Sequence, residues 1–303
     1  MVLILCQNNS ATIRKTLESV LAFGPILVGD LGSSDNTLDI CEEFGAQIKH
    51  IRCDTRDQAR NKLCEDAQGP CLWIEPWEIV ISASGKSLEG TAYATVLQNK
   101  TITKEIRIWD GSPRFINPIF ERLDLETDQE KDIVIYSNGG ALPANVMESI
   151  EIWKAQEPLA TAPYYYQSAV LFSTGKMDDF LRVAEHYLFM EKSVSMSAIM
   201  MRYYFSIAQV IHRKTARPAL QNLNLCLCAK PLMAEFWCLT GDVYYHLMQN
   251  FDLAREFYEN AILMGRKRLK ADLWPMEIVK YNTYPKKLIE SCDQILSTTA
   301  RLA

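Results

Sequence analysis

Apolar and polar positions follow two alternating patterns along the first 75 residues. Residues 2–6 form a continuous apolar run, which is typical of a strand buried on both faces of a parallel sheet. Ser10 is placed to cap the helix that follows. Further strands are predicted at 25–29, 47–51 and 71–74, and helices at 35–44 and 55–67. This alternation predicts right-handed crossovers and a mostly parallel sheet.

The pattern loses its regularity after residue 75 and becomes helical after about residue 145. Strands are predicted at 105–109 and 133–136, with a charged loop between them. The clearest helical unit is 234–265, where small and aromatic residues recur as in a tetratricopeptide helix pair: Trp237, Gly241, Tyr244, Ala254, Tyr258 and Ala261. Weaker copies lie at 164–190 and 197–229. A generic helical bundle is the alternative.

The organisation predicted from these patterns is an α/β domain over residues 1–145 and a helical repeat domain over 146–303. A chain of 303 residues with 48% apolar side chains can bury the cores that two such domains need. No apolar run approaches the roughly 18 residues of a spanning helix, and no basic segment precedes a long apolar one. We therefore expect a cytoplasmic protein without a membrane span.

Cysteine usage and charge narrow the function classes. Nine cysteines are an odd number and show no CxxC spacing, which argues against a disulfide framework and against structural zinc. The net charge of −5 gives no global reason to bind nucleic acid. Basic residues do gather between Arg266 and Lys287, and a solvated surface strip is the simpler interpretation of them.

The turn after the second strand is the first candidate for chemistry. It reads Gly29-Asp30-Leu31-Gly32-Ser33-Ser34-Asp35 and leads into a helix. A carboxylate at a strand end can accept a hydrogen bond from a base or a ribose, and a helix start favours anionic oxygens. The pattern therefore indicates a nucleotide site, although Ser33 or Ser34 could also serve simply to cap the helix.

Several landmarks in order resemble the family-2 glycosyltransferases with the GT-A fold. They are Leu3 to Asn9, Leu17 to Val20, Gly29 to Thr37, Ala59 to Asn61 and Leu72 to Glu78. The chain is most similar to the subgroup with tetratricopeptide repeats behind the catalytic domain. The resemblance covers about residues 2–140 and, more loosely, the helical remainder. It implies a GT-A domain of α/β class followed by an all-α domain like tetratricopeptide repeats.

The resemblance implies a donor site built from the strand ends. Asn8 and Asn9 would lie beside the nucleotide, and Asp30, with Gly32 and Ser33 in its turn, would contact the base or ribose. Arg60 would lie near the base or diphosphate, since a guanidinium pairs bidentately with phosphate oxygens. The alternative for Arg60 is a place on the surface of its helix.

The acidic run after the fourth strand departs from the family pattern. The family usually has Asp-x-Asp-Glu there, which holds Mg²⁺ or Mn²⁺, whereas this chain has Glu75-Pro76-Trp77-Glu78. Glu75 could still reach a metal, but indole offers no oxygen ligand. Phe120 also replaces a family histidine. We expect weak metal dependence, metal-free catalysis or lost activity, with compensating charge from arginines at 60, 107, 114 or 122.

The resemblance further implies transfer with inversion by a single in-line displacement. Glu121 matches the family's catalytic glutamate and is the first candidate for the general base. Glu78 is the second candidate. The alternative for Glu121 is a solvated residue in an acidic stretch.

The implied donor is a nucleotide sugar, most often a uridine diphosphate sugar in this family. The acceptor stays open among a polypeptide side chain, a glycan and a hydroxylated nucleobase on DNA, and the last would give the basic residues after Arg266 a purpose. The helical repeat would present a concave surface to the acceptor or to a protein partner. A rival hypothesis is a non-catalytic binding or scaffold protein with a degenerate acidic run.

Overall fold

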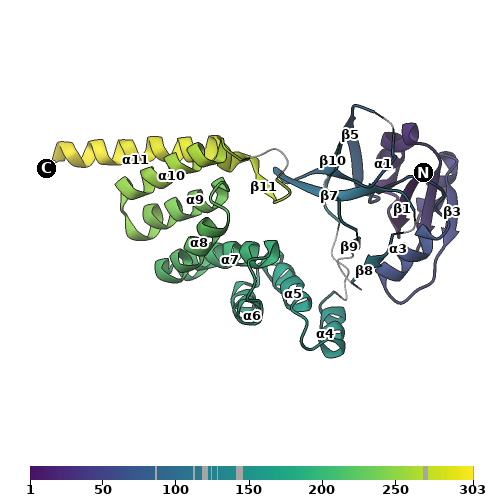
Figure 1. Cartoon of the computed structure of the whole chain (residues 1–303), viewed down its shortest axis with the longest axis horizontal. Helices are drawn as coiled ribbons and strands as arrows, with labels where there is room; N and C mark the ends of the chain where they lie inside the picture. The colour runs from purple at the N-terminus through teal and green to yellow at the C-terminus, as the bar shows by residue number, and fades with distance from the viewer. Residues whose placement is uncertain are drawn as a thin grey trace. The chain divides into compact units, whose positions relative to one another are not determined.

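The chain forms two compact units, Met1–Val146 and Met147–Ala303. The computed structural model describes residues 1–85, 87–111, 113–117, 122–123, 125–127, 129–140, 146–268 and 272–302. A strand-rich first unit and a helical second unit are evident in Figure 1. An α/β domain followed by an all-α domain is thereby confirmed.

The first unit begins with strands and helices in regular alternation. They are β1 (Val2–Cys6), α1 (Ile13–Val20), the 3-10 turn η1 (Leu21–Phe23), β2 (Ile26–Asp30), α2 (Thr37–Glu43), β3 (Gln47–His50), α3 (Arg56–Cys64) and β4 (Cys71–Trp73). Strand β1 pairs in parallel with β2 and β4, and β2 pairs in parallel with β3. The parallel sheet predicted for these residues is confirmed.

The rest of the first unit adds mostly strands. They are β5 (Glu78–Ala83), β6 (Ala92–Gln98), β7 (Thr101–Trp109), β8 (Phe115–Ile116), β9 (Arg122–Leu123) and β10 (Glu130–Ser137). The main sheet runs in the order β3-β2-β1-β4-β7-β6-β10-β5, and β8 and β9 form a small separate ribbon. Because β7 is antiparallel to both β4 and β6, the sheet is mixed beyond its parallel half. Strands β5 and β6 were not predicted.

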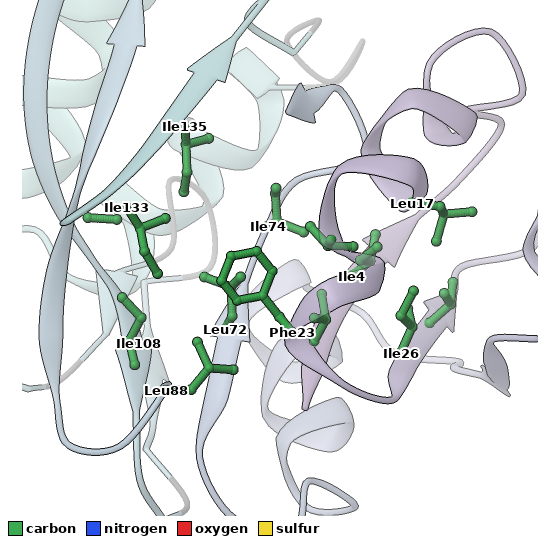
Figure 2. Packing of buried hydrophobic residues seen from close by; sticks show 14 of the residues in the cluster. Ile4, Leu17, Phe23, Ile26, Leu72, Ile74, Leu88, Ile108, Ile133 and Ile135 are labelled. Carbon is green, nitrogen blue, oxygen red and sulfur yellow. The ribbon is translucent and has the colours of Figure 1, made fainter. Parts of the chain in front are cut away.

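Both faces of β1 are covered, which explains its unbroken apolar sequence. Ile4 packs in one cluster with residues of α1, β4, β7 and β10, including Leu17, Leu72, Ile108 and Ile135. Figure 2 shows these side chains converging between the sheet and the helices. On the opposite face, Leu3 and Leu5 pack with α3 and with an aromatic group, in agreement with the period-two alternation of strand side chains.

The second unit is built from helix pairs. Its elements are α4 (Val146–Gln156), α5 (Ala162–Ser173), α6 (Met177–Met190), α7 (Met196–Ala208), η2 (Gln209–Arg213), α8 (Ala216–Ala229), α9 (Ala234–Asp242), η3 (Val243–Met248), α10 (Phe251–Gly265), β11 (Met276–Glu277), η4 (Ile278–Tyr281) and α11 (Thr283–Leu302). Helices α5 and α6, α7 and α8, and α9 and α10 pack in pairs, and α11 packs on α10. These pairs correspond to the three predicted repeats.

Gly241 shows why one repeat needs a small residue. A Cβ atom there would lie 2.6 Å from the Tyr258 ring, so only glycine allows α9 and α10 to approach this closely. Within the described part of the chain, no helix is both long and apolar enough to cross a membrane.

Candidate donor-binding site

Three parallel strands end at the same edge of the sheet. Cys6 at the end of β1 lies opposite Asp30 at the end of β2, and Asp30 lies opposite His50 at the end of β3. A cleft of about 360 Å³ opens there, lined by Gln7, Leu31, Ile51, Arg52, Cys53, Asp54, Thr55 and Arg56. This is the edge where open α/β sheets bind their ligands.

Asp30 stands beside this cleft with its carboxylate fixed by several donors. Oδ1 accepts from the Ser33 backbone N–H at 2.9 Å, and Oδ2 accepts from that of Gly32 at 3.1 Å. His50 Nδ1 lies 3.1 Å from Oδ2. Burial raises the pKa of Asp30, but these hydrogen bonds outweigh it and hold the pKa below its ordinary value. Asp30 is therefore a fixed anion at neutral pH although it is only 2% exposed.

Asn8 ties the turn after β1 to the turn after β2. Its Oδ1 accepts from the Ser34 backbone N–H at 2.8 Å, and its own backbone N–H donates to Ser33 Oγ at 3.1 Å. The residue adopts a left-handed conformation with φ of 55°, which asparagine tolerates better than most residues. Asn8 is therefore a structural link between the two turns at the cleft edge.

Asn9 and Asp35 complete this interlocked pair of turns. The Asn9 backbone N–H donates to Thr37 Oγ1 at 2.7 Å, and Asn9 Oδ1 accepts from the Gln7 backbone N–H at 2.8 Å. Asp35 Oδ2 accepts from the Ser10 backbone N–H at 3.1 Å. The turn after β1 is thus held by the turn after β2 before any ligand binds.

The predicted helix caps differ from those observed. Neither Ser33 nor Ser34 caps α2, because the Thr37 backbone N–H donates instead to Asp35 Oδ1 at 3.0 Å. Ser10 also does not cap α1, which begins after Thr12 without a side-chain cap. Ser33 and Ser34 were misassigned because the turn after β2 is longer than predicted, and α2 begins only at Thr37.

Glu75 follows β4 and forms a buried ion pair with the arginine expected in the donor site. Its Oε1 accepts from Arg60 Nη1 at 2.8 Å and from Trp73 Nε1 at 2.7 Å. The Arg60 guanidinium lies 4.4 Å from the centre of the Trp73 ring and 5.2 Å from that of Phe115. Arg60 is therefore not exposed on the helix surface, because its buried guanidinium pairs with Glu75 and packs against two aromatic rings.

Electrostatics keep Glu75 ionised in this setting. Burial raises the pKa of Glu75. Arg60 and Arg107, followed by the Trp73 hydrogen bond and Arg56, lower it by more, so the net shift is downward. Its other oxygen, Oε2, is buried and has no hydrogen-bond partner among the described residues. Arg56 Nη2 lies 3.9 Å from it.

Glu78 is engaged by a second buried arginine. Arg107 Nη1 and Nη2 donate to its two carboxylate oxygens at 3.0 and 2.9 Å, and Glu78 is only 2% exposed. Burial lowers the pKa of Arg107, but Glu78 and Glu105 raise it more, so the guanidinium stays charged. This bidentate pair opposes a role for Glu78 as the general base, since a buried guanidinium covers both oxygens of the carboxylate.

The acidic run does not fit a divalent cation. Glu75 and Glu78 are each paired with an arginine, and Pro76 and Trp77 between them offer no oxygen side chain. Among the residues the structure describes, no three His, Cys, Asp or Glu side chains are grouped so as to hold a metal. The assignment of Glu75 as a metal ligand is therefore not supported by its surroundings.

Comparison with known proteins identifies the first part of this sheet. Residues 1–74 match the model of the family described as glycosyl transferase family 2. The match contains β1 to β4 and the Asp30 turn and ends one residue before Glu75. No curated protein matches the chain.

Two solved structures are similar to about half of the chain. MamA 41-end from Desulfovibrio magneticus RS-1 is 16% identical, with a TM-score of 0.38, and the match covers 52% of this chain and 86% of that one. A tetratricopeptide repeat protein from Parabacteroides merdae is 17% identical, with a TM-score of 0.36, and the match covers 51% and 59%.

Two residues near the Asp30 turn were missed from the sequence. His50 was not assigned to any motif, although its place at the end of β3 puts it against Asp30. Arg56 was also missed, although it precedes Arg60 by four residues on α3 and therefore shares its helix face. The parallel register of β2 and β3 and the spacing of these arginines were the available signals.

Other predicted residues lie away from this cleft or outside the described residues. Glu121 and Phe120 fall outside the described part of the chain, as does the side chain of Arg122. Arg114 is exposed. The role of Glu121 as the base therefore stays a prediction.

The second unit has a pocket of its own, of about 290 Å³. Its lining includes Tyr203, Ile207, Leu239, Asp242, Glu277 and Tyr284. Asp242 Oδ1 accepts from the Tyr284 hydroxyl at 2.7 Å, and Glu277 Oε1 accepts from the Tyr203 hydroxyl at 2.8 Å. Its acidic groups are thus bonded within the fold, while aliphatic, tyrosine, histidine and lysine side chains form the rest of the wall.

The basic residues after Arg266 do not form one solvated strip. The Arg268 side chain is buried, donates to Asp272 Oδ2 at 3.1 Å and lies 3.8 Å from Glu235. Lys280 lies 3.9 Å from Asp242. Arg266, Lys267, Lys286 and Lys287 are exposed. The exposed positive charge is therefore smaller than the sequence suggested.

Proposed function

We propose that this chain is a glycosyltransferase that transfers a sugar from a nucleotide diphosphate sugar, a UDP-sugar, to an acceptor hydroxyl with inversion. The observation that carries the proposal is the buried, ionised Asp30 at the edge of the 360 Å³ cleft, within residues of glycosyl transferase family 2. A carboxylate fixed in this way can accept hydrogen bonds from a base or a ribose without first reorganising.

The donor nucleotide would lie across the ends of β1, β2 and β3. Asp30 would bind the base or ribose, and the cleft wall from Ile51 to Arg56 would enclose the nucleotide from the β3 side. Asn8, Asn9, Gly32 and Ser33 would hold the shape of this edge through the hydrogen bonds between the two turns.

The proposed reaction is one in-line displacement at the anomeric carbon. The acceptor oxygen forms a bond to that carbon while the bond to the diphosphate oxygen breaks, and the electron pair leaves with the nucleoside diphosphate. Glu121 is the proposed base that takes the acceptor proton, because the sequence resemblance places it at the position of the family's catalytic glutamate. Acceptors under this proposal are a polypeptide side chain, a glycan or a hydroxylated nucleobase on DNA.

The donor site can be tested with nucleotide sugars and one matched pair of variants. We expect the wild-type protein to gain thermal stability with one donor of a panel, since a ligand that binds only the folded state stabilises it. Asp30→Ala should lose most of this stabilisation. Asp39→Ala, which removes an exposed carboxylate from α2, should keep it. Absence of a shift with every donor would refute the proposed function.

Transfer itself is tested by release of the nucleoside diphosphate in the presence of candidate acceptors. Glu121→Ala should leave donor binding unchanged and lower the rate of release by about 10²-fold or more, as expected for loss of a general base. Release at the wild-type rate would exclude Glu121 as the base.

A second candidate function is a non-catalytic binding protein. The buried pairs of Glu75 with Arg60 and of Glu78 with Arg107 favour it, because arginines occupy the carboxylates with which the family usually binds a metal ion. The helical unit would then bind a protein partner, with the pocket around Tyr203 and Leu239 as one contact. Donor binding without release for any acceptor class would favour this function over the first.

A further inference from the structure

We infer that the nucleotide diphosphate is bound here through arginine, with Arg56 as the main contact, and that binding requires no divalent cation. The inference rests on the proposed donor site and specifies its chemistry. Three observations carry it: the buried pairs of the acidic run, the packing of Trp77 inside that run, and the arginines that line the cleft.

The first observation is that a cation would have to break buried ion pairs. Glu75 Oε1 accepts from both Arg60 and Trp73, and both oxygens of Glu78 accept from Arg107. Turning either carboxylate toward a cation would leave a buried guanidinium without its counter-charge, which is a costly arrangement. Glu75 Oε2 has no hydrogen bond among the described residues, but Arg56 Nη2 lies 3.9 Å from it, so a cation there would compete with a guanidinium.

The second observation concerns Trp77, which stands between the two glutamates. A Cβ atom added at Gly140 would lie 2.4 Å from the Trp77 ring, so the indole packs directly against the backbone after β10. The Glu75 backbone N–H also donates to Glu78 Oε2 at 2.9 Å. These contacts hold the run in its present form, in which the arginines already balance the carboxylates.

The third observation is that positively charged side chains line the cleft. Arg52 and Arg56 both line it, and Asp54 is the single carboxylate among the lining residues. Arg56 opens α3, so a phosphate beside it would also meet the positive end of that helix. Glu75 faces both arginines of α3, with Oε2 at 3.9 Å from Arg56 Nη2 and Oε1 at 2.8 Å from Arg60 Nη1.

The chemistry of the guanidinium suits this task. Its planar fork can donate two hydrogen bonds to phosphate oxygens, whereas a lysine acts as a point charge. Arg56 would thus supply the charge compensation and orientation that the family obtains from a metal ion. Because the Arg60 guanidinium is buried against Trp73 and Phe115 and pairs with Glu75, Arg60 supports this arrangement without contacting the ligand.

The test is isothermal titration calorimetry of the full chain with UDP, GDP and ADP and with the matching monophosphates. Each titration is made with EDTA and with Mn²⁺. We expect one diphosphate to bind with affinities that agree within about threefold in the two conditions, and to bind more tightly than its monophosphate. A gain of more than about tenfold with Mn²⁺ would overturn the inference.

Variants of the cleft arginine provide the second arm. Arg56→Gln should weaken diphosphate binding by about tenfold or more and remove the preference over the monophosphate, whereas Arg56→Lys should restore part of it. Arg14→Gln, on α1 and paired with Glu43, is the matched control and should bind as the wild type does. Wild-type affinity in Arg56→Gln would overturn the assignment of Arg56.

Direct metal binding is measured separately, by the electron paramagnetic resonance signal of free Mn²⁺ during titration with protein and the diphosphate. We expect the protein to withdraw no more Mn²⁺ than the diphosphate alone does, and stoichiometric withdrawal would overturn the inference. If no nucleotide binds in either condition, the proposed function itself fails. That outcome differs from metal-dependent binding, in which the function stands and only the metal-free inference fails.

Discussion

Asp30 and Glu75 form an instructive pair, because each follows a buried parallel strand of the same sheet, yet their partners differ. Asp30 is bonded to the backbone N–H groups of Gly32 and Ser33 and to His50. Glu75 is bonded to Arg60 and Trp73. Both carboxylates have pKa values below the ordinary one, but only Glu75 has a full positive charge beside it.

The difference determines what each carboxylate can offer a ligand. Backbone dipoles stabilise the charge of Asp30 without cancelling it, so the Asp30 turn retains a net negative charge for a base or ribose donor. The arginines offset the charge of Glu75, which leaves less negative charge in the acidic run. One edge of the sheet thus contains an anionic turn and a neutralised run.

The largest effect that tests this comparison is expected from Arg107→Met. It would leave Glu78 buried with no counter-charge, and the free energy of unfolding of the first unit should fall by about 3–5 kcal/mol. Urea unfolding followed by tryptophan fluorescence measures it. The double variant Arg107→Met with Glu78→Gln should recover part of the loss. A single-variant loss below about 1 kcal/mol would mean that the run is not held by this pair.

A smaller effect is expected from Asp30→Asn, which removes a charge held by three donors. The free energy of unfolding should fall by about 2 kcal/mol at neutral pH. Because folding lowers the pKa of Asp30, its stabilisation is present above the unfolded pKa and disappears as the pH falls through the folded value. Below about pH 5 the wild type should therefore lose stability faster than the variant does. If the free energies of unfolding of the wild type and of Asp30→Asn fell in parallel in acid, Asp30 would not be a fixed anion in the folded protein.

Gly29→Ala probes the packing beneath the Asp30 turn. The added Cβ would lie 2.9 Å from Ile51 Cδ1 and 3.0 Å from Leu5 Cδ1, so these side chains must shift, at a cost of about 1–2 kcal/mol. Gly85→Ala is the control, since a Cβ there meets no atom within 4 Å. Equal melting temperatures for the two variants would show that the turn tolerates more than its packing indicates.

The smallest effect is expected from Arg14→Gln. Arg14 and Glu43 pair at 2.6 Å, but both side chains are about half exposed. Exposed pairs contribute little because water and ions screen them, so the free energy of unfolding should change by less than about 0.5 kcal/mol. If Arg14→Gln lowered the free energy of unfolding as much as Arg107→Met does, burial would not explain why the Arg107–Glu78 pair stabilises the fold more than the Arg14–Glu43 pair.

The sequence by itself determined much of the first 75 residues. The apolar run of β1 reflects burial on both faces, and the turn at Asp30 predicted a carboxylate at a strand end. The spacing of small and aromatic residues likewise predicted the pair of α9 and α10. These features depend on local periodicity and turn chemistry, which are written along the chain.

Only the tertiary structure decided which groups face one another. The insertion of β7 beside β4 brings Arg107 to Glu78, and the ribbon strand β8 brings Phe115 over Arg60, held by Asn61 through hydrogen bonds of 2.7 and 3.0 Å. Neither pairing has a signal in sequence spacing, because each joins segments far apart along the chain. The sequence resemblance assigned Arg60 to a base or diphosphate, but in the fold it is the partner of Glu75. A buried carboxylate and a buried guanidinium pair because either charge alone would be costly away from water.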